Sequence, residues 1–223
     1  MKVEGETIKQ IANTSFQAVF RTTMETPGFI HLVFSKKEIT PYQFRSIMID
    51  LKKELSKLSV SKFNKKLSYH WLVRFDQQVT TPFHVDNAAD QSILMLGYEP
   101  SAIKSELHIA DYYTYANEVF EAPEDYFNNF SPVFKDNENV LLPFISKLKS
   151  VNMDNYSILI INNSSPKPDV DTLGVFHKAL IINKDLNKNR IVNSMVLNVV
   201  SRDQVTEDEQ RENSFLNTNL ISK

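Results

Sequence analysis

The sequence predicts a mainly β fold with flanking α-helices, built as one domain over residues 1–223. Two observations predict it. Residues 1–66 carry apolar side chains at helical spacing, whereas residues 67–200 break into short β-rich runs separated by turn residues. A chain of 223 residues is also a normal size for a single domain. Many short strands are typical of a sandwich or jelly roll, in which a ligand site lies between two antiparallel sheets.

The strongest helix signal lies in the N-terminal part, which we interpret as helical support for the β core. Thr40-Pro41-Tyr42-Gln43 combines an N-cap, a proline at the first helical position and a capping-box glutamine. Apolar residues then recur at helical spacing: Phe44, Ile47, Met48, Leu51, Leu55 and Leu58. We expect this stripe to pack into the core, and the lysines beside it to form a solvated face: Lys52, Lys53 and Lys57.

From residue 67 onwards, β-rich composition predicts strands over residues 71–75, 92–96, 106–115, 156–161, 175–182 and 190–200. Turn residues separate them, including the polar clusters at 162–166 and 185–189. Residues 116–150 lack this pattern and are predicted to be a helical or irregular insert. The polar residues 201–223 are expected to form either a docked helix or a loose tail.

The segment Pro82-Phe83-His84-Val85-Asp86-Asn87 is the most informative part of the chain. Side chains two residues apart on an extended segment point the same way, so His84 and Asp86 could hold one metal ion together. A second histidine from a distant strand would complete three ligands on one face of an octahedron and leave the other positions open. His177 is the best candidate.

The order of His-x-Asp, a distant histidine and then an arginine resembles the Fe(II)/2-oxoglutarate-dependent oxygenases. The resemblance spans roughly residues 69–200. It implies that His84, Asp86 and His177 bind Fe(II), and that Arg190 binds the distal carboxylate of 2-oxoglutarate. It also implies a double-stranded β-helix, a cupin-like jelly roll, with helices packed on the outside of its larger sheet.

Two further residues are candidates for the cosubstrate site. Family members often place Ser or Thr two residues after the arginine, whereas here that position is Val192 and a hydroxyl follows at Ser194. Strand alternation keeps Ser194 on the same face as Arg190. Arg74 lies in an apolar strand and is an alternative anchor, the other interpretation being a salt bridge with Asp76 or another carboxylate.

The resemblance implies that O2 is a substrate, that 2-oxoglutarate is decarboxylated to succinate and CO2, and that an unidentified small molecule or side chain is hydroxylated. Two alternatives stay open. The first is another cupin-like metalloenzyme that shares the three ligands but does not use 2-oxoglutarate. The second is a metal-free jelly roll that serves as a binding module.

Composition excludes several other classes. The net charge of -2 lacks the basic excess of nucleic-acid-binding proteins, and zero cysteines exclude disulfides and cysteine-based zinc sites. The acidic N-terminus is unlike a secretion signal, and no apolar run is long enough to cross a membrane. We therefore expect a cytoplasmic protein without nucleic-acid or membrane partners. The remaining histidines, His31, His70 and His108, are interpreted as structural or exposed, and Tyr98 as a residue that packs or lines a pocket.

Overall fold

The structure, a computed structural model, describes residues 1–34, 39–148, 154–206 and 208–222. Its centre is a six-stranded sheet with the strand order β1-β2-β7-β4-β9-β3. In that order the strands span Lys2–Val3, Phe29–Phe34, Tyr156–Asn162, Ser92–Tyr98, Ile191–Ser201 and Lys65–Asp76. All neighbours in this sheet run antiparallel except β1 and β2.

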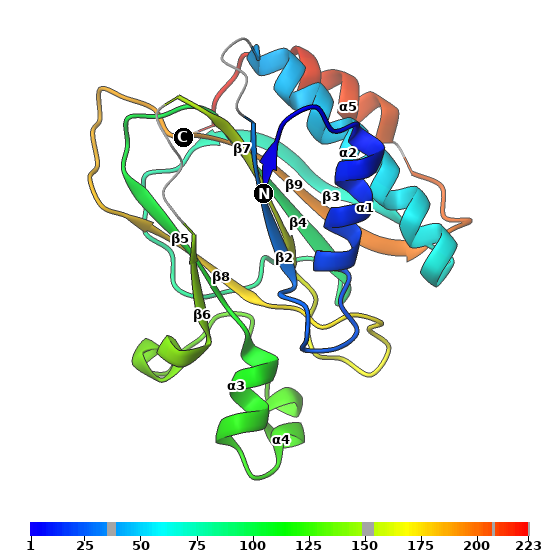
Figure 1. The fold of residues 1–223 in the computed structure, drawn as a ribbon, viewed down its shortest axis with the longest axis vertical. Coiled ribbons are helices and arrows are strands. Elements are labelled where there is room, and N and C mark those ends of the chain that lie inside the picture. Colours follow the sequence, from blue (N-terminus) through cyan, green and yellow to red (C-terminus); the bar gives the residue numbers. More distant parts are fainter. Residues whose placement is uncertain (35–38, 149–153, 207, 223) are drawn as a thin grey trace.

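A second sheet of three antiparallel strands has the order β6-β5-β8 and covers one face of the large sheet (Figure 1). Its strands span Ile145–Leu148, Ser105–Ala110 and Phe176–Ile181. Apolar side chains from both sheets fill the space between them, among them Leu94, Leu107, Ile109, Leu159 and Val196. The two sheets therefore enclose a core of their own.

Three helices cover the opposite face of the large sheet: α1 (Ile8–Val19), α2 (Pro41–Phe63) and α5 (Asp208–Asn217). The predicted start of α2 is confirmed, because Thr40 caps the helix and forms a capping box with Gln43. Most of the predicted apolar stripe packs against sheet residues such as Met95 and Met195. This layer is the helical support that the sequence predicts.

The C-terminal segment forms a docked helix, one of its two predicted states. Helix α5 buries Phe215 and Glu212 against α2 and β3. The interpretation of Lys52 as part of a solvated face is wrong, because α5 covers it. Lys52 is buried, forms an ion pair with Asp208, and lies 4.4 Å from the ring centre of Tyr69.

The fold is mixed α/β with a large sheet rather than mainly β, since helices occupy about as many residues as strands. Two local differences from the prediction act in opposite directions on this balance. Residues Phe29–Phe34 form strand β2 inside the region predicted to be helical. The sequence pattern does not identify this strand, because a short apolar run has neither helical nor strand periodicity. The strand predicted over 106–115 ends at Ala110, because the Asp111 side chain caps a helix from Tyr112 onwards.

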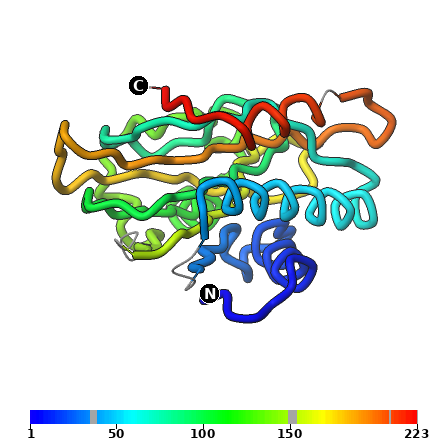
Figure 2. The backbone as a smooth tube through the Cα atoms, turned by 90° about the horizontal axis from the view of Figure 1, so that it is seen from above, coloured from blue at the N-terminus to red at the C-terminus, as the bar shows by residue number. Residues whose placement is uncertain are grey.

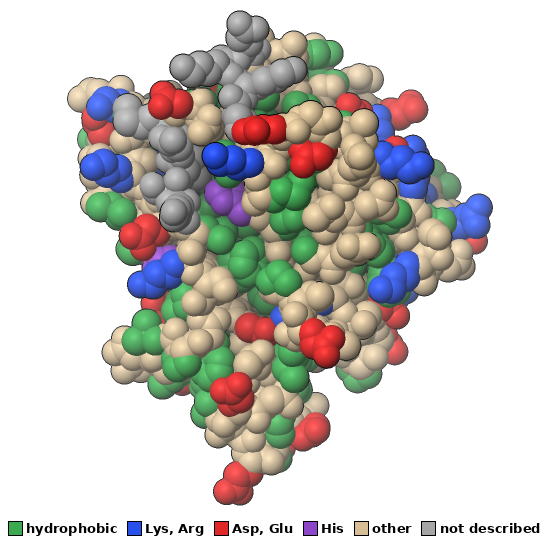
Figure 3. Space-filling view, viewed as in Figure 1, with side chains coloured by type: hydrophobic (Ala, Val, Ile, Leu, Met, Phe, Trp, Pro, Cys, Tyr) green, Lys and Arg blue, Asp and Glu red, His purple; other side chains and the backbone are tan. Residues whose placement is uncertain are grey.

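The insert predicted at 116–150 is partly helical and partly irregular where it is described, and it ends in strand β6. Its residues 149 and 150 lie outside the described part, as do residues 207 and 223 of the C-terminal segment. Helices α3 (Tyr112–Val119) and α4 (Pro123–Asn128) and the 3-10 helix η1 (Glu138–Phe144) precede β6. Figure 3 shows acidic but no basic side chains on this face of the lobe formed by α3 and α4. The lobe thus presents negative charge on the visible face.

The two ends of the described chain lie on opposite sides of the molecule (Figure 2). Met1 lies beside β2, and Ser222 pairs with Phe75 along the outer edge of β3. Among the described helices, none combines the length and apolar character needed to cross a membrane.

Candidate metal centre

Two neighbouring extended segments carry the histidines of the candidate site. His84 lies between β3 and β4, and His177 lies in β8. They are direct antiparallel partners: the His84 amide donates to the His177 carbonyl at 3.0 Å, and the reverse bond measures 2.9 Å. Opposed residues of an antiparallel pair place their side chains together on one face. The two imidazole ring centres are accordingly 4.1 Å apart.

Asp86 completes the group. It follows His84 by two residues, so its carboxylate returns to the same face of the segment. One carboxylate oxygen lies 3.6 Å from His84 Nε2 and the other lies 3.8 Å from His177 Nε2. Neighbouring ligands of a small octahedral ion are about 3 Å apart at bond lengths of about 2.1 Å, so modest side-chain movements would bring all three onto one ion. The predicted trio therefore converges and could hold a metal ion.

The ring hydrogen bond of His84 uses Nδ1 and leaves Nε2 available to bind a metal ion. Its Nδ1 lies 2.9 Å from the Pro82 carbonyl oxygen, which orients the ring and leaves Nε2 facing Asp86. His177 Nδ1, by contrast, is buried and has no hydrogen-bond partner in the described part of the chain. His84 is thus oriented by a hydrogen bond of its ring, whereas His177 is held through its main chain.

The pKa values of the three groups follow from their environment. Burial, with the nearby charge of His84, lowers the pKa of His177 to about 4. Burial would raise the pKa of Asp86, but the hydrogen bond from His84 and the charges of both histidines lower it below its usual value. Burial would lower the pKa of His84, yet hydrogen bonds to Asp86 and to Pro82 raise it. Near neutral pH, Asp86 is therefore ionised and His177 is neutral, whereas His84 binds a proton more readily than a free imidazole does.

The group forms part of the wall of a cavity of about 310 Å³ between the two sheets. Apolar residues make up most of this wall, among them Trp71, Phe75, Leu107, Ile109 and Leu159. Polar side chains are contributed by Gln77, Thr81, Tyr98 and Ser194, besides Lys178 and the metal group. A volume of this size suits a small molecule bound next to the metal group.

Arg190 is buried just before β9, against two residues that line the cavity. Its Nη1 donates to Gln77 Oε1 at 2.6 Å, its Nε donates to Ser105 Oγ at 3.0 Å, and its guanidinium carbon lies 4.9 Å from the Tyr98 ring centre. The remaining nitrogen, Nη2, is buried and finds no acceptor among the described residues. An unpaired donor on a buried charge is costly. Arg190 is not itself among the residues that line the cavity, but its neighbours Gln77 and Tyr98 are.

Tyr98 presents a second unpaired group at this place. Its hydroxyl is buried and likewise lacks a hydrogen-bond partner in the described structure. Burial raises the pKa of Tyr98, while the charge of the neighbouring Arg190 guanidinium and its interaction with the Tyr98 hydroxyl act in the opposite direction. The phenol is therefore a neutral donor next to a guanidinium. The sequence indicates that Tyr98 packs or lines a pocket, but it gives no sign that its hydroxyl is unpaired.

The other two predicted cosubstrate residues differ from Arg190. Ser194 lines the cavity, but its hydroxyl already accepts a hydrogen bond from Trp71 Nε1 at 3.3 Å. The prediction of Arg74 as an alternative anchor is wrong. It lies on the face of β3 opposite Val73 and Phe75, which line the cavity, and pairs with Glu99 at 3.1 and 3.2 Å. Arg74 therefore does not reach the cavity, and the salt-bridge interpretation is the correct one.

The remaining histidines lie away from the metal group. His108 Nε2 lies 2.8 Å from a carboxylate oxygen of Glu106, on the face of β5 opposite the cavity residues Leu107 and Ile109. His31 is partly buried in β2, where burial and the neighbouring N-terminal charge lower its pKa to about 4. His70 is exposed on β3. Their structural interpretation agrees with these positions.

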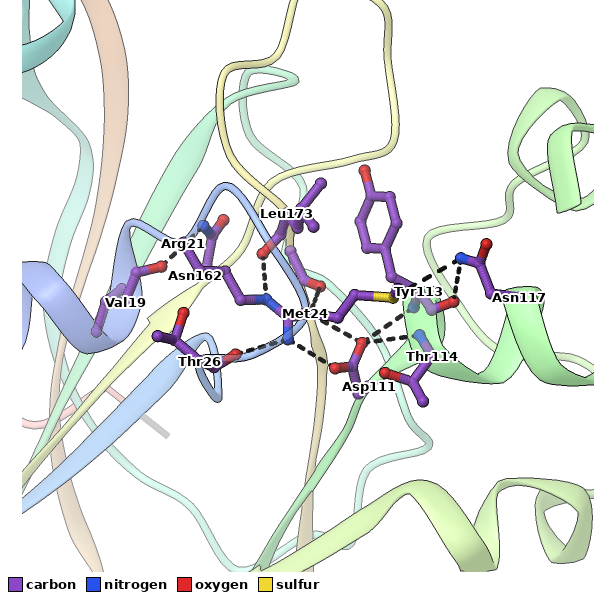
Figure 4. Close-up of polar contacts among 11 residues, drawn as sticks. Val19, Arg21, Met24, Thr26, Asp111, Tyr113, Thr114, Asn117, Asn162 and Leu173 are labelled. Carbon is purple, nitrogen blue, oxygen red and sulfur yellow. Dashed lines mark hydrogen bonds and ion pairs between the residues drawn. The ribbon is translucent and has the colours of Figure 1, made fainter.

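Arg21 lies where several segments of the chain meet, as Figure 4 shows, and the sequence gives no signal for this role. Its guanidinium forms two hydrogen bonds to the Asp111 carboxylate, at 2.6 and 2.8 Å. It also donates to the main-chain carbonyls of Leu173 and Gly174, directly before β8. Arg21 thus connects the start of α3 to the strand that carries His177.

Models of known protein families give no match to this chain, and a comparison with curated proteins also gives none.

Proposed function

We propose that this chain is a non-haem Fe(II) oxygenase that uses 2-oxoglutarate and O2 to hydroxylate a small molecule or a side chain. The observation that carries the proposal is that a candidate metal site and a buried arginine lie at the same cavity. A two-histidine, one-carboxylate group lies in the cavity wall, and a buried arginine with an unpaired nitrogen lies against the same wall. That donor set is typical of facial Fe(II) sites with open positions. A guanidinium is suited to binding a carboxylate.

The strand order supports a jelly-roll, double-stranded β-helix interpretation of the β core. From β3 to β9 the chain crosses between the layers after every strand except β5, which β6 follows in the same sheet. Strands β3, β4, β7 and β9 lie in the large sheet, while the His84 segment, β5, β6 and β8 lie in the small one. Within each layer these segments pair antiparallel, in the orders β3-β9-β4-β7 and His84 segment-β8-β5-β6. Two such interleaved layers with a ligand site between them are the expected arrangement.

Each residue has a distinct role in this proposal. His84, Asp86 and His177 would hold Fe(II), which supplies O2 activation and oxidative decarboxylation of 2-oxoglutarate when bound. Arg190 and Tyr98 would bind the distal carboxylate through the buried Nη2 and the hydroxyl. The apolar cavity wall would exclude water from the reacting groups.

Metal binding is the first test. We expect the wild-type protein, reconstituted anaerobically, to bind about one equivalent of Fe(II) or Co(II), and His84→Ala and Asp86→Ala to lose it. His108→Ala is the matched control, because His108 also has a carboxylate neighbour two residues away but lies outside the cavity. Unchanged metal content in both ligand variants, measured by elemental analysis, would disprove the site.

Turnover of 2-oxoglutarate separates the proposal from its alternatives. We expect the Fe(II)-loaded protein to release succinate slowly from 2-oxoglutarate in air, and the His177→Ala variant to release none. If the protein binds metal but neither binds 2-oxoglutarate nor forms succinate, the cupin-like metalloenzyme is the better interpretation. If the protein binds no metal, the metal-free binding module is the better interpretation.

A further inference from the structure

The main chain around Asp86 needs a support that regular secondary structure does not provide. His84 and His177 hold each other through their paired amides, but Asp86 lies beyond this bridge, in a connection without helix or strand hydrogen bonding up to β4. An aspartate side chain is short, so the position of its carboxylate depends closely on the position of its own backbone. Whatever fixes the Asp86 backbone therefore helps to fix the third ligand.

The side chain of Asn163 provides this support. Its Oδ1 accepts a hydrogen bond from the Asp86 amide at 2.7 Å, and its Nδ2 donates to the Asp86 carbonyl at 3.1 Å. One amide side chain thus satisfies both main-chain groups of a candidate metal ligand. Only one orientation of the amide can do this, because the oxygen must face the N–H group and the nitrogen the carbonyl.

Asn163 is itself fixed firmly. It is 1% exposed and follows the last residue of β7, a central strand of the large sheet. Asn163 Nδ2 also donates to Ser92 Oγ at 2.9 Å, and the main-chain N–H of Asn163 donates to the main-chain carbonyl of Ser92 at 3.0 Å. In return, Ser92 Oγ donates to the main-chain carbonyl of Asn163 at 3.2 Å. The Asp86 backbone is therefore tied to the large sheet through a buried asparagine that contacts no ligand atom.

We propose that Asn163 is a positioning residue for the metal site, which sets the carboxylate of Asp86 for ligation by holding the Asp86 main chain. This inference rests on the proposed metal site. Partners outside the ligand set that orient a ligand typically change metal affinity by about 10- to 100-fold when they are removed. We expect Asn163→Ala to lower the affinity for Co(II) by that amount in the folded protein, well below its melting temperature.

The chain offers a matched control in the same connection. Asn198 Oδ1 accepts a hydrogen bond from the Ala89 amide at 3.0 Å, so it supports the same segment by the same kind of bond but holds no ligand residue. Asn198→Ala should keep wild-type Co(II) affinity, whereas Asn163→Ala should also change the visible absorption of bound Co(II), because the carboxylate is held less well. A loss of stability alone would alter neither quantity in folded protein.

The outcomes separate the two proposals. If the wild type does not bind Co(II), the metal site itself is wrong and this inference falls with it. If the wild type binds Co(II) and Asn163→Ala binds it equally well, or if Asn198→Ala loses as much affinity, the positioning role is wrong and the metal site stands. If Asn163→Ala does not fold, Ser92→Ala replaces it. Losing the Ser92 hydrogen bond should weaken Co(II) binding about two- to tenfold, and unchanged affinity would overturn the role.

Discussion

Tyr98 and Arg190 each keep one buried polar atom unpaired within the described structure, and both should bind the distal carboxylate of 2-oxoglutarate. Removing one member of a desolvated charge pair costs about 2 to 5 kcal/mol. We therefore expect Arg190→Ala to weaken 2-oxoglutarate binding about 30-fold to several-thousand-fold. Tyr98→Phe removes one hydrogen bond to a charged group, about 1.5 to 3 kcal/mol, and should weaken binding about 10- to 150-fold. Anaerobic titration calorimetry of the metal-loaded protein measures both.

Arg74→Ala is the control for that experiment. Arg74 pairs with Glu99 on the face of β3 away from the cavity, so its removal should leave 2-oxoglutarate affinity unchanged. It should instead lower the free energy of unfolding by about 3 to 5 kcal/mol, because Glu99 stays buried without its partner. A loss of 2-oxoglutarate affinity in Arg74→Ala but not in Arg190→Ala would show that the anchor is misassigned.

Metal binding should weaken on acidification through a single proton. The pKa of His84 is raised above its ordinary value, while that of Asp86 is lowered and that of His177 is about 4. Below the pKa of His84 a proton competes with the metal for Nε2, so affinity should fall about tenfold per pH unit; above it, affinity should be constant. Co(II) dissociation constants across this range measure the slope. A two-proton slope above pH 5 would contradict the pKa of His177.

At the residue scale, the sequence predicts the three ligands and Arg190, because their residue types, spacing and order are visible in one chain. Asn163 and Arg21 act through hydrogen bonds that depend on which segments meet in space, and the position of Tyr98 beside Arg190 depends on the same contacts between segments. Asn163 stands in a polar cluster that is typical of any turn, and the sequence gives no sign of its contact with Asp86. Such supporting residues leave no local pattern.

At the scale of elements, the start of α3 depends on a partly buried ion pair. The Asp111 carboxylate caps this helix and binds Arg21, whose charge outweighs the effect of burial and lowers the pKa of Asp111. Asp111→Ala should lower the free energy of unfolding by about 3 to 5 kcal/mol, because Arg21 stays buried and charged.

The exposed pair of Lys65 and Asp171 is the control for Asp111. Asp171→Ala should cost at most about 1 kcal/mol, since both side chains are partly solvated. Chemical denaturation measures both variants. Equal effects would show that the Arg21–Asp111 pair contributes no more than a surface contact.

A terminal signal identified an element only where the composition that follows it agrees. Helix α2 begins where Thr40 and Pro41 place it. Strand β2 follows the turn signal Pro27-Gly28, but this signal does not say which kind of element comes next, and β2 lies in a region of helical composition. Helix α3 has a cap at Asp111, but the tyrosines that follow favour strands when judged by composition alone. Capping outweighs that preference here, because it satisfies two main-chain N–H groups.

At the scale of the whole molecule, two apolar layers serve different purposes. The helices and the large sheet bury one core, while the cavity and the metal group lie between the two sheets. Phe215 belongs to the first layer and is 3% exposed. Phe215→Ala should therefore lower the free energy of unfolding by about 3 to 5 kcal/mol, which is roughly 6 to 20 °C in Tm.

Co(II) affinity of folded Phe215→Ala should stay at the wild-type value, since α5 lies on the far side of the large sheet. Leu220→Ala, at a highly exposed position, should change neither quantity. A parallel loss of Co(II) affinity and stability in Phe215→Ala would show that the two layers are coupled.

The position of β9 has a consequence for the order in which the protein can be made. Strand β9 lies between β4 and β3 and pairs with both. The two earlier strands β3 and β4 therefore cannot be joined into one sheet until residues 191–201 have left the ribosome. The main-chain partner of His84 likewise arrives 93 residues later, in β8. Such non-local pairings give a high contact order and slow folding, on the scale of milliseconds to seconds. The nascent chain should therefore remain unable to bind metal at this site until β8, which carries His177, has been synthesised.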